Sequence, residues 1–155
     1  MNSSKRILLV DDSPQDVEMT LEAMAETHRD HEVIALRDGA EALDYLYRRG
    51  AFAGRPAEQP AVVLLDLKMP KVDGMEVLRQ LKNDPQLRLV PVVIMTSSRE
   101  AQDVIGCYQL GANAYVVKPA TFHEFVEIVK HLVAFWTLTN EPPPAGGRKT
   151  HPGGG

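Results

Sequence analysis

The sequence predicts an α/β fold, a doubly wound sheet of five parallel strands with helices on both faces. Two observations predict it: short apolar runs alternate along the chain with amphipathic stretches, and these runs are continuously apolar. Continuous apolar runs are typical of parallel strands that are buried on both faces. A β-then-α order repeated along the chain favours a parallel sheet, and 155 residues suggest one domain.

The predicted strands are the apolar runs themselves. Each run is four residues long, which suits a buried strand better than a helix. In chain order they are residues 7–10 (ILLV), 33–36 (VIAL), 62–65 (VVLL), 92–95 (VVIM) and 114–117 (AYVV).

The predicted helices follow the strands and carry recognisable start and stop signals. Ser13-Pro14 opens the first helix, because proline is preset for a first helical turn. Capping boxes, in which a cap residue precedes a glutamate by three positions, open the second helix at 38–41 and the fifth at 121–124. The third and fourth helices are expected over 75–83 and 99–110, with Gly111 ending the fourth, and the fifth is expected to reach about residue 137.

The C-terminal segment differs in composition from the rest. Residues 141–155 hold four of the eleven prolines and five of the eleven glycines, so they can neither continue a helix nor bury a core. We therefore predict one folded domain over 1–139 and a disordered Pro/Gly-rich tail over 140–155.

The bulk composition excludes several classes. A net charge of −4 argues against a nucleic-acid binder, which usually has a basic stripe. The single cysteine, Cys107, cannot form an intramolecular disulfide, which favours a reducing compartment. The start of the chain does not have the pattern of a signal peptide, and no apolar stretch approaches the ~18 residues that a membrane span needs. We expect a cytoplasmic protein with no membrane or nucleic-acid partner.

Polar residues follow the predicted strands at the point where each ends. Asp11-Asp12 follows the first strand, Asp66 the third, Thr96 the fourth and Lys118 the fifth. In doubly wound folds the functional site lies beyond the carboxyl ends of the strands, so these side chains are expected to converge. Clustered carboxylates repel one another and need a cation, and Mg²⁺ prefers such oxygen ligands. A carboxylate can also act as a nucleophile towards phosphorus, with Thr96 and Lys118 offsetting charge on the phosphoryl oxygens.

Over about residues 5–136 the chain resembles the receiver domains of two-component response regulators, which have a flavodoxin-like (βα)5 fold. Single motifs are weak, but together they match in order, each at a strand end. They are ILLVDDS at 7–13, LLDLKMP at 64–70 with DG at 73–74, MTS at 95–97 and GANAYVVKP at 111–119. Within the family the chain looks most like the stand-alone regulators that pair with bacterial phytochrome histidine kinases. The long loop 51–60 and the aromatic residues at 122, 125, 135 and 136 suggest this placement.

The resemblance implies a role for each matched position around a Mg²⁺ ion. Asp66 matches the phosphoacceptor. Asp12 matches a direct metal ligand, Asp11 a carboxylate that reaches the ion largely through water, and the backbone carbonyl of Lys68 the remaining protein ligand. The expected partner is a sensor histidine kinase, and the expected output is a switched protein-binding surface formed by the fourth helix, the fifth strand and the fifth helix.

The resemblance also implies roles around the phosphoryl group. Lys118 matches the lysine that pairs with the phosphoryl oxygens, and its bond to Pro119 is expected to be cis. Thr96 and Tyr115 match the hydroxyl and the aromatic residue that change position together on phosphorylation. Lys68 and Ser98 occupy the two positions that set the lifetime of the phosphoryl group.

Other interpretations stay open at this point. Alone, Asp66 or Asp11-Asp12 would suit a helix cap, Lys118 a solvated surface lysine, Thr96 a plain turn, and Tyr115 an ordinary sheet aromatic. A phosphotransferase of the haloacid-dehalogenase type also uses a strand-end aspartate, but it carries a second aspartate two residues later, where this chain has a lysine. A receiver that is never phosphorylated and acts as a scaffold is a third interpretation, which the intact acidic set disfavours.

The fifth helix predicts a homodimer. Its apolar residues cover about half of the helix circumference, wider than the ~100° stripe that faces a single core, and such excess often marks a partner site. The residues expected at the interface are Ile128, Phe135 and Trp136. The alternative is that the C-terminal segment folds back and covers the extra apolar face within one chain.

Overall fold

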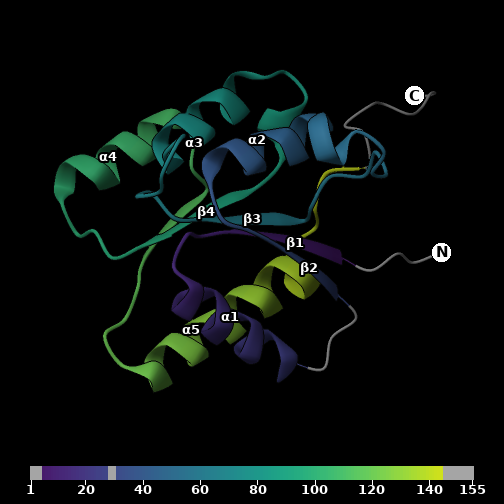
Figure 1. Cartoon of the computed structure of the whole chain (residues 1–155). Helices are drawn as coiled ribbons and strands as arrows, with labels where there is room; N and C mark the ends of the chain where they lie inside the picture. Colours follow the sequence, from purple (N-terminus) through teal and green to yellow (C-terminus); the bar gives the residue numbers. More distant parts are fainter. Residues whose placement is uncertain (1–4, 28–30, 145–155) are drawn as a thin grey trace.

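The computed structural model describes residues 5–27 and 31–144. Within them one all-parallel sheet has the strand order β2-β1-β3-β4-β5 (Figure 1). Its strands are β1 (Lys5–Val10), β2 (His31–Leu36), β3 (Val62–Leu65), β4 (Val92–Thr96) and β5 (Ala114–Val117). The predicted doubly wound sheet is confirmed, and the order reverses between β1 and β3, which places a switch point beside their carboxyl ends.

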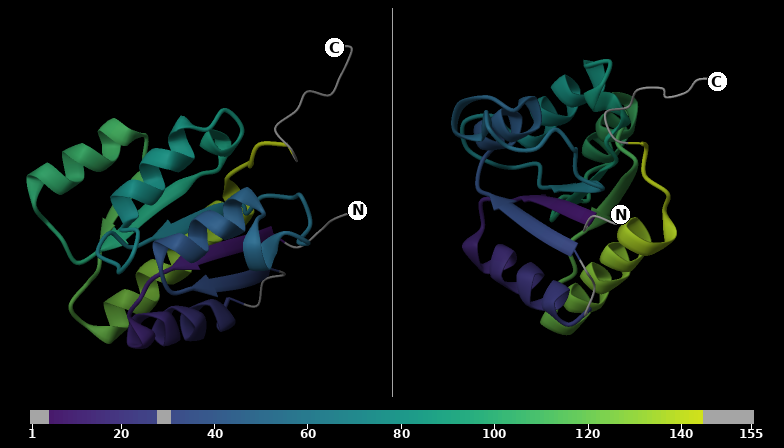
Figure 2. Two further views of the ribbon diagram at one scale, coloured as in Figure 1. Left: turned by 45° about the horizontal axis from the view of Figure 1, so that its top comes forward. Right: turned by 90° about the vertical axis from the view of Figure 1, so that its right-hand side faces the viewer.

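Helices cover both faces of the sheet. α1 (Pro14–Ala25) and α5 (Phe122–Ala134) lie on one face, whereas α2 (Gly39–Tyr47), α3 (Gly74–Asn83) and α4 (Ala101–Leu110) lie on the other (Figures 1 and 2). Short helical turns η1 (Gly50–Phe52), η2 (Leu87–Leu89) and η3 (Phe135–Thr139) complete the described elements. None of the helices in this part of the chain has the length and apolar character needed to cross a membrane.

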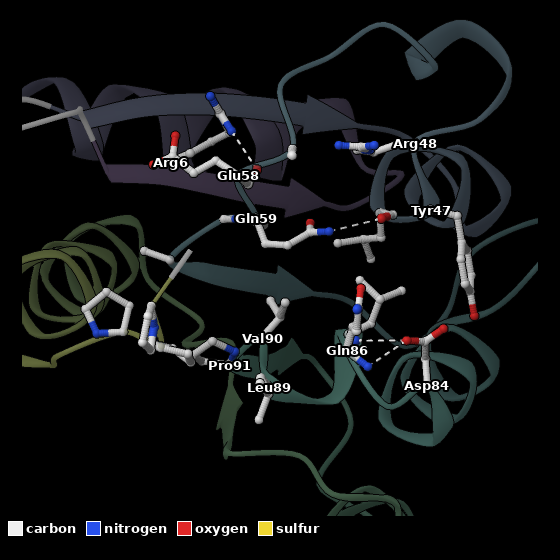
Figure 3. A pocket seen from close by; sticks show the side chains of 18 of the residues that line it. Arg6, Tyr47, Arg48, Glu58, Gln59, Asp84, Gln86, Leu89, Val90 and Pro91 are labelled. Carbon is white, nitrogen blue, oxygen red and sulfur yellow. Dashed lines mark hydrogen bonds between the residues drawn. The ribbon is translucent and has the colours of Figure 1, made fainter. Parts of the chain in front are cut away.

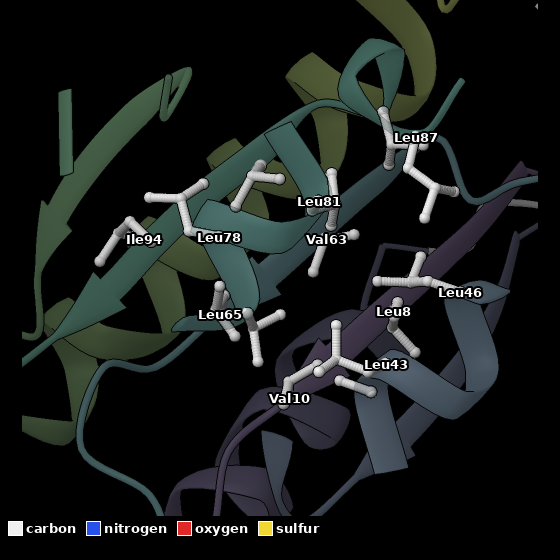
Figure 4. Packing of buried hydrophobic residues seen from close by; sticks show 14 of the residues in the cluster. Leu8, Val10, Leu43, Leu46, Val63, Leu65, Leu78, Leu81, Leu87 and Ile94 are labelled. Atoms are coloured by element: carbon white, nitrogen blue, oxygen red, sulfur yellow. The ribbon is translucent and has the colours of Figure 1, made fainter. Parts of the chain in front are cut away.

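The strands contribute side chains to two separate cores, which explains why their central residues are apolar on both faces. Leu8 and Val10 pack with α2 and α3 in one core (Figure 4), whereas Ile7 and Leu9 pack with α1 and α5 in the other. Successive side chains of a strand point to opposite faces, so a strand that is covered on both faces buries every side chain in its covered part. Each core includes side chains from several neighbouring strands, and this packing holds the strand ends in a fixed register.

Side chains cap the helices at the predicted starts. Ser13, Asp38 and Thr121 each accept a hydrogen bond from the backbone N–H three residues later, as an N-cap residue does. The box at Asp38 departs from the expected pattern in one bond, because Glu41 Oε1 accepts from Arg37 N instead of Asp38 N. α1, α2 and α5 therefore begin where the sequence predicts.

The C-terminal part of the chain departs from the predicted uniform helix. α5 ends at Ala134, and the wider π-helical turn η3 follows it to Thr139. Residues 140–144 then run irregularly to the amino ends of the strands, where Pro142–Pro144 line a cavity of about 750 Å³ together with Arg6 and Gln86 (Figure 3). Residues 145–155 lie outside the described residues, so the predicted disorder of the tail stays a prediction.

Candidate functional site

The carboxyl ends of β1, β3, β4 and β5 bring the predicted polar residues to one rim of the sheet. The amide of Asp66 donates to the carbonyl of Val10 over 3.0 Å, which ties the end of β3 to the end of β1. The amide of Lys118 donates to the carbonyl of Thr96 over 2.7 Å, which ties the end of β5 to the end of β4. This rim lies at the opposite end of the strands from the cavity of Figure 3, which holds none of these residues.

Three carboxylates on this rim form a cluster that suits a metal ion. Ligand atoms of Asp11, Asp12 and Asp66 all lie within 4.8 Å of one another. Asp11 and Asp66 are buried, at 4% and 8% exposed, whereas Asp12 is exposed to solvent. Charges this close repel in a partly dry setting, and a hard divalent cation that keeps some water on its open side fits such a set. Lys68, whose carbonyl was predicted as a further ligand, lies exposed two residues beyond Asp66.

The ammonium of Lys118 is shared among three carboxylates. Its Nζ lies 2.9 Å from Asp11 Oδ2 and 3.4 Å from Asp66 Oδ2, but only 2.7 Å from Asp16 Oδ2. The Lys118 side chain is 8% exposed, so these ion pairs are only weakly screened by solvent. The predicted meeting of Lys118 with the acidic cluster is therefore present, and Asp16 is an additional partner.

Asp16 is the site residue that sequence reasoning missed. It lies in the first turn of α1, where its backbone N–H donates to the cap residue Ser13 over 3.2 Å. Its only sequence signal is that it follows Asp12 by four positions, about one helical turn, on a helix that starts at the rim. The bond to Lys118 spans 102 residues and depends on the sheet order, so neither residue's neighbours reveal it.

Burial and charge act differently on the two central groups. Burial raises the pKa of Asp11 above its ordinary value, and the hydrogen bond from Ser13 N and the attraction of Lys118 offset this only in part. Burial by itself would lower the pKa of Lys118, but the hydrogen bond to Asp16 and the attraction of Asp11 and Asp66 outweigh it and raise that pKa. Lys118 is therefore a permanent ammonium at physiological pH.

Thr96, Ser98 and Tyr115 are linked in one chain of hydrogen bonds beside the rim. Thr96 is 1% exposed, and its Oγ1 accepts from Ser98 N over 3.3 Å. The hydroxyl of Tyr115 donates to Ser98 O over 3.0 Å, and the hydroxyl of Ser98 donates to Asp103 Oδ2 over 2.6 Å. The two predicted switch residues thus both hold Ser98, which lies in the segment between β4 and α4.

The expected cis bond before Pro119 is wrong, because every peptide bond in the described residues is trans. The trans form is also the lower in free energy for an X-Pro bond, by about 0.5–1 kcal/mol. Lys118 reaches its three carboxylates with the bond in this form.

Gly74 shows why the sequence DG follows the third strand. A Cβ atom built on Gly74 would lie 2.1 Å from the carbonyl oxygen of Asp66 and 2.7 Å from the Cα of Leu67. The start of α3 therefore packs directly against the main chain of Asp66, and Gly74 N donates to Leu67 O over 2.8 Å. This contact fixes the backbone of the candidate phosphoacceptor.

The three residues predicted at a dimer interface have different positions. Trp136 is only 9% exposed and belongs to the core beneath α1 and α5, so its assignment to an interface is corrected: it packs within its own chain. Ile128 is half-buried against the same core, whereas Phe135 is 45% exposed and contacts Trp136 edge to face. Most of the wide apolar stripe is therefore internal packing, and Phe122 and Phe135 are exposed parts of it.

This fold, with an acidic cluster and a lysine at the carboxyl ends of its strands, defines the class of the protein. The model of the response regulator receiver domain matches residues 7–130, and the chain belongs to that family. It is a receiver domain of a two-component system, with a role in phosphorylation-dependent signalling and a sensor histidine kinase as its partner. Receiver domains bind a divalent cation, and the three clustered aspartates suit Mg²⁺.

Particular relatives refine this placement. Response regulator Rcp1 of Synechocystis sp. is 39% identical over 144 residues, which cover 93% of this chain and 97% of Rcp1. The phosphorylated cyanobacterial phytochrome response regulator RcpA superposes with a TM-score of 0.86 at 39% identity, covering 91% of this chain and 99% of RcpA. The Mn²⁺-bound form of Rcp1 gives 0.85 at 39% identity, with 90% and 99% covered. The bacteriophytochrome response regulator RtBRR is 53% identical with a TM-score of 0.73, covering 92% and 86%.

Proposed function

We propose that Asp66 is the residue of this response regulator that accepts the phosphoryl group. The observation that carries the proposal is the position of its carboxylate. It is 8% exposed, shares a cluster with Asp11 and Asp12, and has the Lys118 ammonium 3.4 Å from one oxygen. A cation held by the three carboxylates and the Lys118 ammonium would place positive charge on two sides of the reacting oxygens, and positive charge there stabilises the negative charge that develops during phosphoryl transfer.

The transfer is a displacement at phosphorus. An oxygen of Asp66 attacks the phosphorus of a phosphohistidine, the P–N bond breaks, and the imidazole nitrogen keeps the electron pair and takes up a proton. Asp11, Asp12 and Asp66 would hold a divalent cation, which would neutralise charge on the phosphoryl oxygens and on the carboxylates. Lys118 donates a hydrogen bond to a phosphoryl oxygen, and Thr96 offers its hydroxyl to another. Water then hydrolyses the acyl phosphate, so the domain promotes only its own phosphorylation and dephosphorylation.

The relatives support a finer assignment of the partner. RcpA is a phytochrome response regulator, and RtBRR is a bacteriophytochrome response regulator. We propose that the kinase of this chain is likewise a bacteriophytochrome, because RtBRR shares 53% identity with this chain over most of both chains. A cytoplasmic location, expected from the single cysteine, stays a prediction.

The output is a change in the surface formed by α4, β5 and α5. Phosphorylation draws the hydroxyl of Thr96 towards Asp66, which frees the N–H of Ser98 and loosens the bond from Tyr115 to the carbonyl of the same residue. The support for this route is that both bonds meet on Ser98. The surface already presents apolar side chains, since Ile105 and Tyr108 of α4 are 55% and 51% exposed.

We also propose that the chain forms a homodimer through the end of α5 and η3. Phe135 and Leu138 are 45% and 55% exposed, and Ile128 lies two helical turns before Phe135 on the same side of the helix. Exposed apolar groups that cluster in this way often mark a contact with another chain. The homodimer is a prediction of this proposal, and its test is given in the Discussion.

The assignment of Asp66 is tested with a small phosphodonor such as acetyl phosphate in the presence of Mg²⁺. The mass of the protein should rise by one phosphoryl group, and Asp66→Asn should stay unmodified under the same conditions. Asp12→Asn, which leaves the nucleophile in place, should be modified slowly but on the same residue. Equal phosphorylation of Asp66→Asn and wild type would overturn the assignment.

A further inference from the structure

Asp16 makes the shortest ion pair of the candidate site, although it lies outside the acidic cluster. Its Oδ2 lies 2.7 Å from Lys118 Nζ, compared with 2.9 Å for Asp11 and 3.4 Å for Asp66. The Asp16 side chain is 24% exposed, more than those of Asp11 and Asp66, at 6% and 10%. It therefore reaches the lysine from the solvent side of the rim, by way of α1.

The backbone of Asp16 is held on both sides. Its N–H donates to the hydroxyl of Ser13 over 3.2 Å, and its carbonyl accepts from the hydroxyl of Thr20 over 2.8 Å. Thr20 is 2% exposed, so the first turn of α1 is fixed against the core. The side chain of Asp16 is consequently aimed at the lysine by a rigid turn.

The donors of Lys118 are all in use before any phosphoryl group arrives. An ammonium has three N–H donors, and the three carboxylates within 3.4 Å account for them. A phosphoryl oxygen on Asp66 can gain a hydrogen bond from Lys118 only if one of the existing bonds is given up or shared. The phosphorylated state therefore competes with the resting contacts of this one side chain.

Asp16 is the strongest competitor among the three carboxylates once a cation is bound. Asp11 and Asp66 belong to the cluster that suits the cation, whereas Asp16 does not. A carboxylate whose charge is shared with a cation attracts an ammonium less, so Asp16 retains the full attraction. Its negative charge also repels the phosphoryl group.

We propose that Asp16 is a positioning residue that holds the Lys118 ammonium on the α1 side of the rim and competes with the phosphoryl group on Asp66 for it. This inference rests on the proposed phosphorylation of Asp66. By drawing the ammonium aside, Asp16 keeps Asp66 and Asp11 available to the cation in the resting protein. By the same contact it shortens the life of the acyl phosphate.

The neutral variant Asp16→Asn separates these two effects because they have opposite signs. Without the Asp16 charge, Lys118 pairs more tightly with Asp11 and Asp66, so Mg²⁺ should bind roughly three- to tenfold more weakly, which is the range of one ordinary net hydrogen bond. The acyl phosphate should last longer by a similar factor, because Lys118 remains with the phosphoryl oxygens. A variant that merely disturbs the fold would weaken both.

The experiment combines Mg²⁺ titration by calorimetry with decay of the acyl phosphate measured by mass spectrometry. Glu18→Gln is the matched control, because Glu18 is an exposed carboxylate of the same helix and its loss changes the net charge equally. It should shift neither quantity. Asp16→Ala is a second variant, expected to act like Asp16→Asn, and thermal unfolding of both variants verifies that they fold.

The background Lys118→Met tests whether Asp16 acts through the lysine. In that background, Asp16→Asn should change Mg²⁺ affinity much less than it does in the wild type. A full effect in that background would identify Asp16 as a metal ligand and overturn the proposal. The proposal also fails if Asp16→Asn alone leaves both the Mg²⁺ affinity and the acyl-phosphate lifetime unchanged, or lowers both. The Mg²⁺ titrations need no phosphorylation, so they decide the role of Asp16 even if Asp66 proves not to be the phosphoacceptor.

Discussion

Removing the Lys118 ammonium should destabilise the metal-free protein, and Mg²⁺ should reverse part of the loss. The variant is Lys118→Met, which keeps an unbranched side chain of similar length but has no charge. In its place four carboxylates, those of Asp11, Asp12, Asp16 and Asp66, would face one another on the rim without a cation. Two of them are less than a tenth exposed, so water screens their repulsion poorly.

The expected magnitude follows from the burial of the ion pairs. Taking one partner from a buried ion pair costs about 3–5 kcal/mol. Asp12 is exposed and Asp16 partly so, which places this site at the low end, with a loss of about 3 kcal/mol in the free energy of unfolding. Mg²⁺ no longer competes with an ammonium in the variant. If it binds about tenfold more tightly than to wild type, the loss narrows by about 1.4 kcal/mol.

Urea unfolding in EDTA and in saturating Mg²⁺ measures both quantities. Lys130→Met is the matched control, because Lys130 also pairs with two carboxylates, those of Glu26 and Glu127, but on the exposed face of α5. Exposed ion pairs contribute little, so this variant should unfold like wild type with and without Mg²⁺. A loss below about 1 kcal/mol for Lys118→Met in EDTA, or one that Mg²⁺ leaves unchanged, would refute this account of the rim.

Three further predictions concern the metal, the lifetime and the assembly. Asp12→Ala should weaken Mg²⁺ binding at least tenfold, whereas the exposed Glu22→Ala should not, as calorimetric titration will show; equal affinities would remove Asp12 from the metal site. Substituting Lys68 and Ser98 together should change the rate of acyl-phosphate hydrolysis several-fold, because they follow Asp66 and Thr96 by two residues and are predicted to control the access of water to the phosphoryl group; an unchanged decay rate would contradict this role. Light scattering at micromolar concentration should give a dimer mass, and Phe135→Asp should shift it towards the monomer without unfolding; a wild-type mass of 17.1 kDa at every concentration would contradict the dimer.

Sequence patterns predicted the strands well because the fold repeats one physical rule. A strand covered on both faces has to be apolar throughout, as 62–65 and 114–117 are, and both segments match the observed strands residue for residue. The carboxyl ends of such strands meet at one edge, so the sequence alone assigns Asp11, Asp66 and Lys118 to one rim. Their proximity in space, 2.9–3.4 Å from ammonium to carboxylate, confirms that reasoning.

Features that depend on contacts between distant elements were not predictable in this way. Asp16 shows no sign of its bond to Lys118, because the partner lies 102 residues away and an aspartate in a first helical turn is ordinary. Trp136 was misassigned for a related reason. Helical periodicity shows how wide an apolar stripe is. Which part of the stripe becomes buried depends on the packing of α1 beside α5 and on the change to a π-helical turn after α5.

The bonds at Ser98 have a consequence for how such proteins diverge. Thr96 accepts a hydrogen bond from the amide of this residue, and Tyr115 donates one to its carbonyl. The coupling that we propose between the rim and the outer face would therefore pass through main-chain atoms, and every residue except proline provides both. The Ser98 hydroxyl bonds to Asp103 and takes no part in these two contacts, so on this proposal its replacement would change the duration of the signal separately. On this proposal, evolution can change the lifetime of the phosphoryl group without changing the hydrogen bonds that transmit the signal.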